Sequence, residues 1–121
     1  MLAYAILGTN DLQQAASFYD EIFAELGARR MQESERSIGW SSEQQPGMAV
    51  ALPYDGKPAV ASNGGMLSLA CKSKMQLDAL YERVLELGAS DEGKPGYRHE
   101  GVYMAYWRDL DGNKMSFVFL S

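Results

Sequence analysis

The apolar positions along the chain follow the same succession twice. Each half begins with a short apolar run and continues with a segment whose apolar residues recur every three or four positions. Each segment then reaches a Leu-Gly-Ala sequence, at 26–28 and again at 87–89. Such spacing indicates a helix that faces a sheet, and a glycine directly after it is typical of a helix end. The repetition predicts two similar modules, of about residues 1–56 and 63–121, around a shared cleft.

In the first half, residues 2–8 form an apolar run that predicts a strand buried on both faces. Asn10 is expected to cap the following helix, with Asp11 in its first turn. Polar residues and the pair Pro46-Gly47 then act as breakers between short segments that suit antiparallel strands. Those segments are 28–33, 36–42 and 48–52, and they are followed by a turn-rich connector at 53–58.

The second half repeats this order. Residues 66–71 predict a strand, Ser73 caps a helix, and Met75 opens an apolar stripe that continues to Leu87. Residues 93–101 contain two turn signals and predict a loop over one edge of the cleft. The clearest hairpin joins 102–108 to 114–120 through a turn at 109–113. The expected fold is therefore α+β, with two βαβββ modules forming a curved mixed sheet around a cleft.

Composition limits the classes of function. The length of 121 residues fits one domain over positions 1–121, and 11 basic against 16 acidic residues give a net charge of −5, which argues against a nucleic-acid partner. The single cysteine excludes a disulfide within the chain, and no apolar run approaches the roughly 20 residues of a membrane span. Without a leader pattern, the chain is expected to be cytoplasmic and to bind neither nucleic acid nor membrane.

Four stretches, in this order and at these separations, carry a family resemblance. They are Asn10-Asp11-Leu12 leading into Ser17-Phe18-Tyr19-Asp20, Pro53-Tyr54-Asp55-Gly56-Lys57-Pro58-Ala59, Asn63-Gly64-Gly65, and Arg108-Asp109-Leu110-Asp111-Gly112-Asn113-Lys114. The chain resembles, over essentially its whole length, the glyoxalase, bleomycin-resistance and extradiol-dioxygenase superfamily, whose fold is called vicinal oxygen chelate. The last stretch departs from the commonest form of its motif in having Leu110 where proline is usual.

The resemblance implies metal ligands at three positions, with histidine near the start of each module and glutamate in the last strand. Here those positions carry Tyr4, Met66 and Ser116. A phenol must lose a proton of pKa near 10 to ligate well, a thioether prefers soft copper(I), and a lone hydroxyl binds a hard ion weakly. We therefore expect a pocket without a metal or other cofactor.

Six side chains are expected to bind a small molecule in the cleft: Tyr4, Trp40, Met66, Met104, Tyr106 and Ser116. Strand alternation should place Tyr4, Met66 and Ser116 on the concave face, although ordinary core filling stays open as an alternative for the set. Tyr103 becomes the alternative if the register of the last strands slips by one residue.

Two further residues can be interpreted as either structural or functional. His99, in the expected loop, is either an exposed histidine or an acid, base or hydrogen-bond donor at the pocket lid. Cys71 is expected to be a small buried hydrophobe rather than a catalytic thiolate, because no basic partner is near it in sequence. No catalytic residue is assigned.

The leading hypothesis is a protein without a metal that binds a small amphipathic or aromatic molecule, and it leans against an enzyme. One alternative, drawn from family analogy, is a metal-dependent glyoxalase-like lyase or isomerase. Another is a non-catalytic interaction protein whose cleft has collapsed. The resemblance also implies a homodimer.

Overall fold

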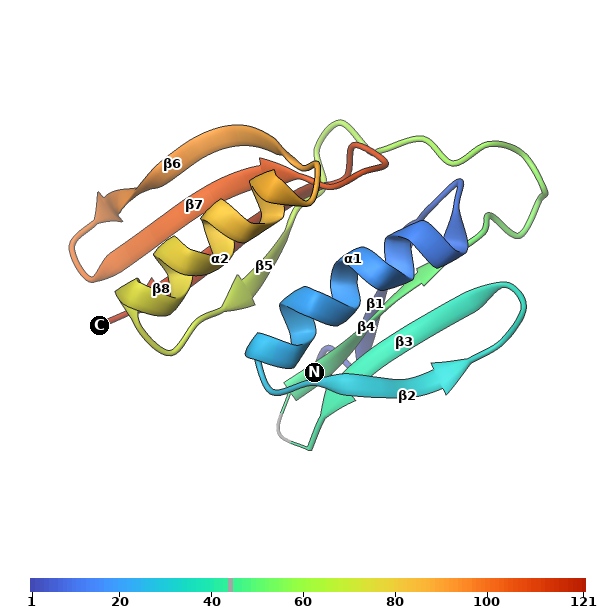
Figure 1. Ribbon diagram of the computed structural model, residues 1–121, viewed down its shortest axis with the longest axis horizontal. Helices are drawn as coiled ribbons and strands as arrows, with labels where there is room; N and C mark the ends of the chain where they lie inside the picture. The colour runs from blue at the N-terminus through green and yellow to red at the C-terminus, as the bar shows by residue number, and fades with distance from the viewer. Residues whose placement is uncertain (44) are drawn as a thin grey trace. The chain divides into compact units, whose positions relative to one another are not determined.

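The computed structural model describes residues 1–43 and 45–121, which form two compact units, Met1–Val60 and Ala61–Ser121 (Figure 1). The first unit contains β1 (Tyr4–Gly8), α1 (Leu12–Glu25), β2 (Arg29–Glu33), β3 (Ser37–Ser42) and β4 (Gln45–Ala51). The second contains β5 (Leu67–Ala70), α2 (Lys74–Glu86), β6 (Ser90–His99), β7 (Val102–Arg108) and β8 (Lys114–Leu120). The structure confirms the expected α+β class with βαβββ written twice.

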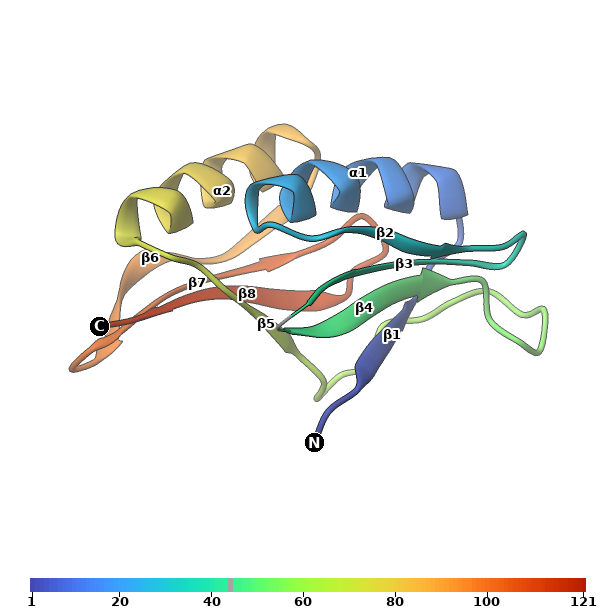
Figure 2. The same ribbon diagram turned by 90° about the horizontal axis from the view of Figure 1, so that it is seen from below.

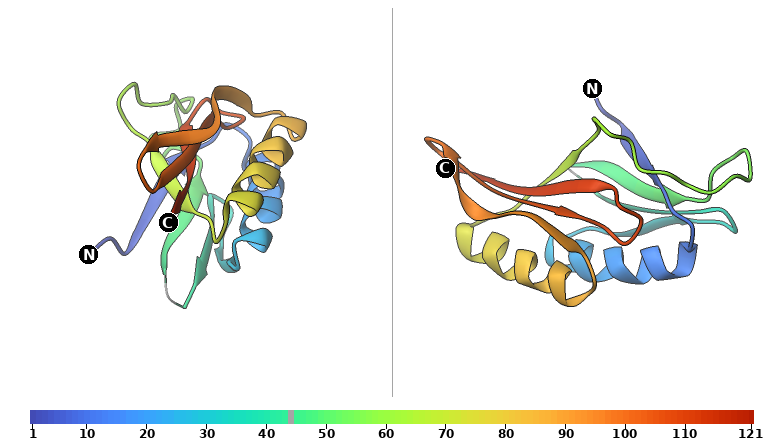
Figure 3. Two further views of the ribbon diagram at one scale, coloured as in Figure 1. Left: turned by 90° about the vertical axis from the view of Figure 1, so that its left-hand side faces the viewer. Right: turned by 90° about the horizontal axis from the view of Figure 1, so that it is seen from above.

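Both sheets have the same topology. The strand orders are β1-β4-β3-β2 and β5-β8-β7-β6, and in each the first strand runs parallel to the last strand of its unit. Each helix packs on one face of its own sheet, as Figure 2 and the further views in Figure 3 show. Each sheet therefore has one face covered by its helix and an opposite face that its helix leaves open.

The helix starts differ from the expectation at one residue. Asp11, not Asn10, caps α1, because its carboxylate accepts the backbone N–H of Gln14 at 3.1 Å. The Asn10 side chain instead binds the backbone of Ala59, whose N–H it accepts at 2.7 Å and to whose carbonyl it donates at 3.1 Å. Asn10 thus fixes the end of the 53–58 connector beside α1. Ser73 caps α2 as predicted.

The expectation that β1 is buried on both faces is wrong. Tyr4 and Ile6 are 63% and 55% exposed. The reason is that β1 lies at the edge of its sheet, and these two residues share the open face with their partners Gly47 and Ala49 in β4.

The expected breakers lie inside strands. Pro46 and Gly47 belong to β4, where an irregular register beside Trp40 and Ser42 accommodates an extra residue. The predicted loop at 93–101 is also wrong, because most of it forms β6. This edge strand shifts register three times against β7 and so tolerates Gly93 and Pro95.

Each core lies between a helix and the covered face of its sheet. In the first unit, the rings of Tyr19 and Phe23 from α1 lie 6.0 and 5.3 Å from the Trp40 ring of β3, and in the second Trp107 packs 5.2 Å from Phe117. Met75, expected to open the apolar stripe of α2, is 81% exposed in the first turn. Over the described residues, neither helix is long and apolar enough to cross a membrane.

One carboxylate joins three elements of the first unit. Asp20 of α1 accepts two hydrogen bonds from the Arg30 guanidinium of β2, at 2.9 and 2.7 Å, and a third from the indole N–H of Trp40 in β3, at 2.8 Å. The hydrogen bonds from Arg30 hold the pKa of Asp20 below its ordinary value, and Asp20 in turn raises the pKa of Arg30. Asp20 therefore fixes the two strands against the helix.

Replacing Asp20 by alanine should lower the free energy of unfolding by about 1–3 kcal/mol, because the buried indole N–H of Trp40 and the Arg30 guanidinium lose their acceptor. Partial exposure of the carboxylate keeps the loss toward the lower end. Asp20→Asn retains an acceptor for the indole but no charge, and should cost less. Urea denaturation measures both.

The wild type and Asp20→Asn also test how stability depends on pH. Since the folded-state pKa of Asp20 is depressed, its stabilisation is complete above the unfolded pKa of about 3.9 and is lost as the pH falls through the folded pKa. The wild type should therefore lose more stability than Asp20→Asn on acidification below about pH 4. Parallel losses in the two proteins would contradict this role.

Candidate functional site

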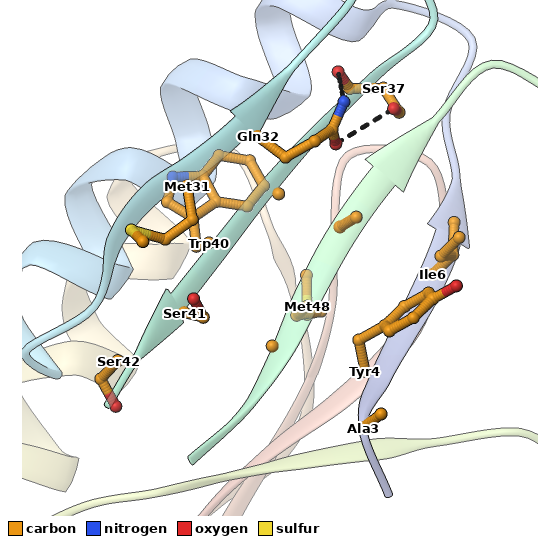
Figure 4. Close-up of a pocket in the computed structure, with 13 residues that line it drawn as sticks. Ala3, Tyr4, Ile6, Met31, Gln32, Ser37, Trp40, Ser41, Ser42 and Met48 are labelled. Atoms are coloured by element: carbon orange, nitrogen blue, oxygen red, sulfur yellow. Dashed lines mark hydrogen bonds between the residues drawn. The ribbon is translucent and has the colours of Figure 1, made fainter. Parts of the chain in front are cut away.

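The open face of the first sheet carries a pocket of about 620 Å³, shown in Figure 4. We call it the trough. Its described lining comes from the residues before β1 and from all four strands of the unit, namely Ala3, Tyr4, Ile6, Met31, Gln32, Ser37, Gly39, Trp40, Ser41, Ser42, Gly47, Met48 and Ala49. None of these side chains carries a formal charge at neutral pH.

Small residues make the floor of the trough. Gly39 of β3 pairs with Ala49 of β4, and Ala49 pairs with Ile6 of β1, so one row across the sheet has almost no side-chain volume at its centre. A Cβ atom at Gly39 would lie 3.4 Å from the Ala49 Cβ, and one at Gly47 would lie 3.1 Å from the Trp40 carbonyl oxygen. The floor is therefore close to bare backbone.

Larger side chains form the two walls. Tyr4 and Ile6 stand on β1, and Met31 on β2 is 62% exposed on the opposite side. In Figure 4 these side chains flank the small residues of β3 and β4. The thioether of Met31 and the ring of Tyr4 face each other across a flat floor, an arrangement that favours a planar apolar ligand.

A polar group lies at one end of the trough. The Gln32 amide oxygen accepts a hydrogen bond from the Ser37 hydroxyl at 3.1 Å, and the amide nitrogen donates to the Ser37 carbonyl at 3.5 Å (Figure 4). The amide is thus held in place, with further donor and acceptor capacity toward the pocket.

Of the six residues expected to bind a ligand, two lie in the first unit. Tyr4 forms part of the wall. Trp40 borders the trough, but its indole lies on the covered face, where it packs on Tyr19 and Phe23 and donates to Asp20. Strand alternation puts Trp40 opposite in direction to Gly39, so its ring is part of the core.

The other four lie in or beside the strands of the second unit. Met66 precedes β5 and is 42% exposed, whereas Ser116 of β8 is fully buried and its hydroxyl lies 2.6 Å from that of Ser68. Tyr106 pairs with Ser116 across the sheet and donates to the Met104 sulfur at 3.5 Å.

Tyr103, the alternative to Tyr106, points to the other face of this sheet. Its hydroxyl donates to Asp78 of α2 at 2.7 Å, which raises the pKa of Tyr103. The register thus puts Tyr106, and not Tyr103, on the open face with Ser116.

The residues at the three positions where the family resemblance implies ligands do not suit a divalent metal. Tyr4 offers a phenol, Met66 a thioether, and the Ser116 hydroxyl is engaged with Ser68. Within 1–43 and 45–121, no group of three or more histidine, cysteine, aspartate or glutamate residues is placed to hold a metal ion.

The two residues with alternative interpretations belong to the second unit and are not among the residues that line the trough. Burial raises the pKa of the Cys71 thiol to about 12, so it stays protonated at neutral pH, as expected of a small buried hydrophobe. His99 is exposed at the end of β6 rather than in a loop.

Sequence reasoning missed most of the trough. Ile6 could have been found, because it lies two residues from Tyr4 on the same face of a strand. Gly39, Gly47 and Met31 could not, because their meeting depends on the pairing of β2, β3 and β4 and on the two irregularities in that pairing.

A family model described as Glyoxalase/Bleomycin resistance protein/Dioxygenase superfamily matches residues 1–117. A glyoxalase/bleomycin resistance protein from Albidiferax ferrireducens is 30% identical, with a TM-score of 0.92 over 100% of this chain and 99% of the other. No curated protein sequence matches at a significant level.

Two more distant structures share the fold. A glyoxalase/bleomycin resistance protein/dioxygenase family enzyme from Burkholderia phytofirmans is 16% identical, with a TM-score of 0.79 and 98% of each chain covered. A lactoylglutathione lyase from Agrobacterium tumefaciens is 19% identical, with a TM-score of 0.72 over 98% of this chain and 92% of the other.

The two floor glycines should respond differently to alanine. Gly39→Ala should change the free energy of unfolding by less than about 0.5 kcal/mol, because its new methyl group makes an ordinary contact and the unfolded chain loses freedom. Gly47→Ala should cost about 1 kcal/mol, because the Trp40 carbonyl must move. Equal stabilities in urea denaturation would contradict the packing described for the floor.

Proposed function

The chain belongs to the Glyoxalase/Bleomycin resistance protein/Dioxygenase superfamily, and from that premise we propose that it binds a small, planar and largely apolar molecule in the trough, without a divalent metal. The trough's floor of Gly39, Gly47 and Ala49 is the observation that carries the proposal. A flat molecule resting there contacts backbone below and the side chains of Tyr4 and Met31 at its edges.

The chemistry of the lining supports binding more than catalysis. An acyl-transfer or proton-transfer reaction needs a group that gains or loses a proton near neutral pH, or a cation that stabilises developing charge. The described lining offers uncharged hydroxyls, one amide and one phenol. These groups orient a ligand through hydrogen bonds, and the Gln32 amide, held by Ser37, is the best placed to do so.

The same reasoning makes the proposed function independent of metal. The described lining of the trough contains no carboxylate and no imidazole, which are the ligands that zinc, nickel and manganese take most readily, and Tyr4, Met66 and Ser116 supply neither group. The proposal therefore assigns no step to a bound ion.

Binding is tested with N-phenyl-1-naphthylamine, an uncharged aromatic probe whose fluorescence rises in apolar sites. Tyr4→Ala should weaken its binding by at least about 1 kcal/mol, roughly fivefold, because one wall of the trough is removed. Met75→Ala, which removes an exposed apolar side chain from α2, is the matched control and should leave the affinity unchanged. Absence of saturable binding, or equal affinities for all three proteins, would refute the proposal and favour an interaction protein.

Metal independence has its own measurement. Stoichiometric zinc, nickel, iron or manganese should be absent from the purified protein by elemental analysis, and adding these ions should not raise the melting temperature. Thermal stabilisation at micromolar metal, together with lyase or isomerase turnover, would instead support a metal-dependent enzyme.

A further inference from the structure

We infer that the ligand of the trough is an aromatic carboxylate, whose charged group the Arg36 guanidinium holds in a second hollow on the same face of the sheet. This inference rests on the proposed function and names the chemical class of its ligand.

The open face of the first sheet continues beyond the trough into a second hollow of about 600 Å³, and both linings include Ile6 and Ser37. The floor of the second hollow is a row in which Gly8, Ala51 and Ser37 pair across β1, β4 and β3. This row lies two residues along the strands from the trough row that contains Gly39, so it faces the same way at a step of about 6.6 Å. A molecule of two fused rings with a carboxylate at one end spans such a step.

The connector at 53–58 lines the second hollow with two prolines and Tyr54. Its end is fixed, because the Asn10 side chain makes two hydrogen bonds to the backbone of Ala59. Ala59 also packs against β1, where a Cβ atom at Gly8 would lie 3.2 Å from the Ala59 Cβ. The connector is therefore held against the strand end, and the second hollow is a defined part of the unit.

The backbone beside the second hollow fixes Arg36, which directly precedes β3 and contributes to the lining. Its guanidinium donates to the Leu52 carbonyl at 3.2 Å, and the Leu52 N–H donates to the Arg36 carbonyl at 2.8 Å. The guanidinium carbon lies 5.0 Å from the centroid of the Tyr54 ring. In the described part of the chain these contacts occupy one of the five N–H groups of the guanidinium, so the others can reach a ligand.

The charge of Arg36 is not balanced by protein. In the described part of the chain, no carboxylate lies at ion-pairing distance from it, whereas Arg30 pairs with Asp20. Asp55 is the one carboxylate in the described lining of the second hollow, and it accepts the backbone N–H of Lys57 at 2.9 Å. A guanidinium in a largely apolar hollow without an acidic partner is suited to an anion supplied by the ligand.

A carboxylate fits this arrangement better than a phosphate. The planar guanidinium presents paired N–H donors that match the two oxygens of a carboxylate, and one cation balances its single charge. A phosphate monoester carries about 1.5–2 negative charges at neutral pH, and the Asp55 carboxylate in the same lining repels the excess. The aromatic part of the ligand then rests on the floor of the trough, beside the ring of Tyr4.

The test compares 2-naphthoate with 2-naphthamide, its uncharged counterpart, by isothermal titration calorimetry on the full chain. 2-Naphthoate should bind at least about fivefold more tightly in about 50 mM salt, and the difference should narrow in about 300 mM salt, because Arg36 is exposed to solvent. 2-Naphthyl phosphate should bind no more tightly than 2-naphthoate. Tighter binding of the phosphate would overturn the assignment of a carboxylate.

Substitutions attribute the preference to Arg36. Arg36→Gln should abolish the preference for 2-naphthoate and leave the affinity for 2-naphthamide within about twofold. Arg29→Gln removes an exposed arginine of the same unit that lines neither the trough nor the second hollow, so this matched control should keep the preference. Asp55→Asn should strengthen 2-naphthoate binding about twofold, because a like charge is removed from the lining.

The contribution of the trough is measured with Tyr4→Ala. This substitution should weaken both naphthyl compounds by a similar factor, because it removes the wall beside the rings. Unchanged affinities in Tyr4→Ala would place the ligand outside the trough and overturn the inference.

Equal affinities of the wild type for 2-naphthoate and 2-naphthamide, or a preference that persists in Arg36→Gln, would also overturn the inference. The proposed function stands in those cases if N-phenyl-1-naphthylamine still binds and responds to Tyr4→Ala. Absence of binding for every aromatic compound would refute the proposed function and the inference together. Because the comparison of the two naphthyl compounds uses the wild type, it gives an answer even if a variant fails to fold.

Discussion

The arrangement of each unit follows from one constraint, which is that a single amphipathic helix covers only one face of a four-stranded sheet. Alternation along the strands then divides the side chains into two sets. In the first unit, Trp40 and Val50 belong to the covered set and are buried, while Tyr4 and Ile6 belong to the open set and remain exposed. The core therefore forms on the covered face, and the side chains of the open face remain available to contact a ligand.

The two open faces differ in chemistry although the units share one topology. The trough is lined by small, apolar and uncharged polar side chains, whereas the second sheet presents Arg98 and Lys114 around Tyr106. The topology does not impose this difference, since both sheets have the same strand order. It arises from side chains that do not take part in core packing and are therefore free to vary with function.

The sequence predicts the elements well because their signals are local. Ser73 at a helix start, the Asp109–Asn113 turn and the apolar periodicity of both helices each act within a few residues. The site is harder to predict, because it depends on register. The irregular pairing around Met31 and Pro46 decides which residues of β2, β3 and β4 share the open face. Trp40 illustrates why residue type alone does not locate a site. An indole suits a cleft wall, but the position of Trp40 in its strand directs the indole toward the core. Likewise Pro95 signals a loop by type, yet an edge strand accommodates it.

The irregular pairing of β6 has a consequence for how the protein behaves at high concentration. A straight sheet edge offers a continuous row of N–H and carbonyl groups to which another polypeptide can attach, the first step toward aggregates. In β6 that row is interrupted by three register shifts, and Pro95 contributes no N–H at all. The same distortions that admit Gly93 and Pro95 thus also protect this border of the sheet against unwanted self-association.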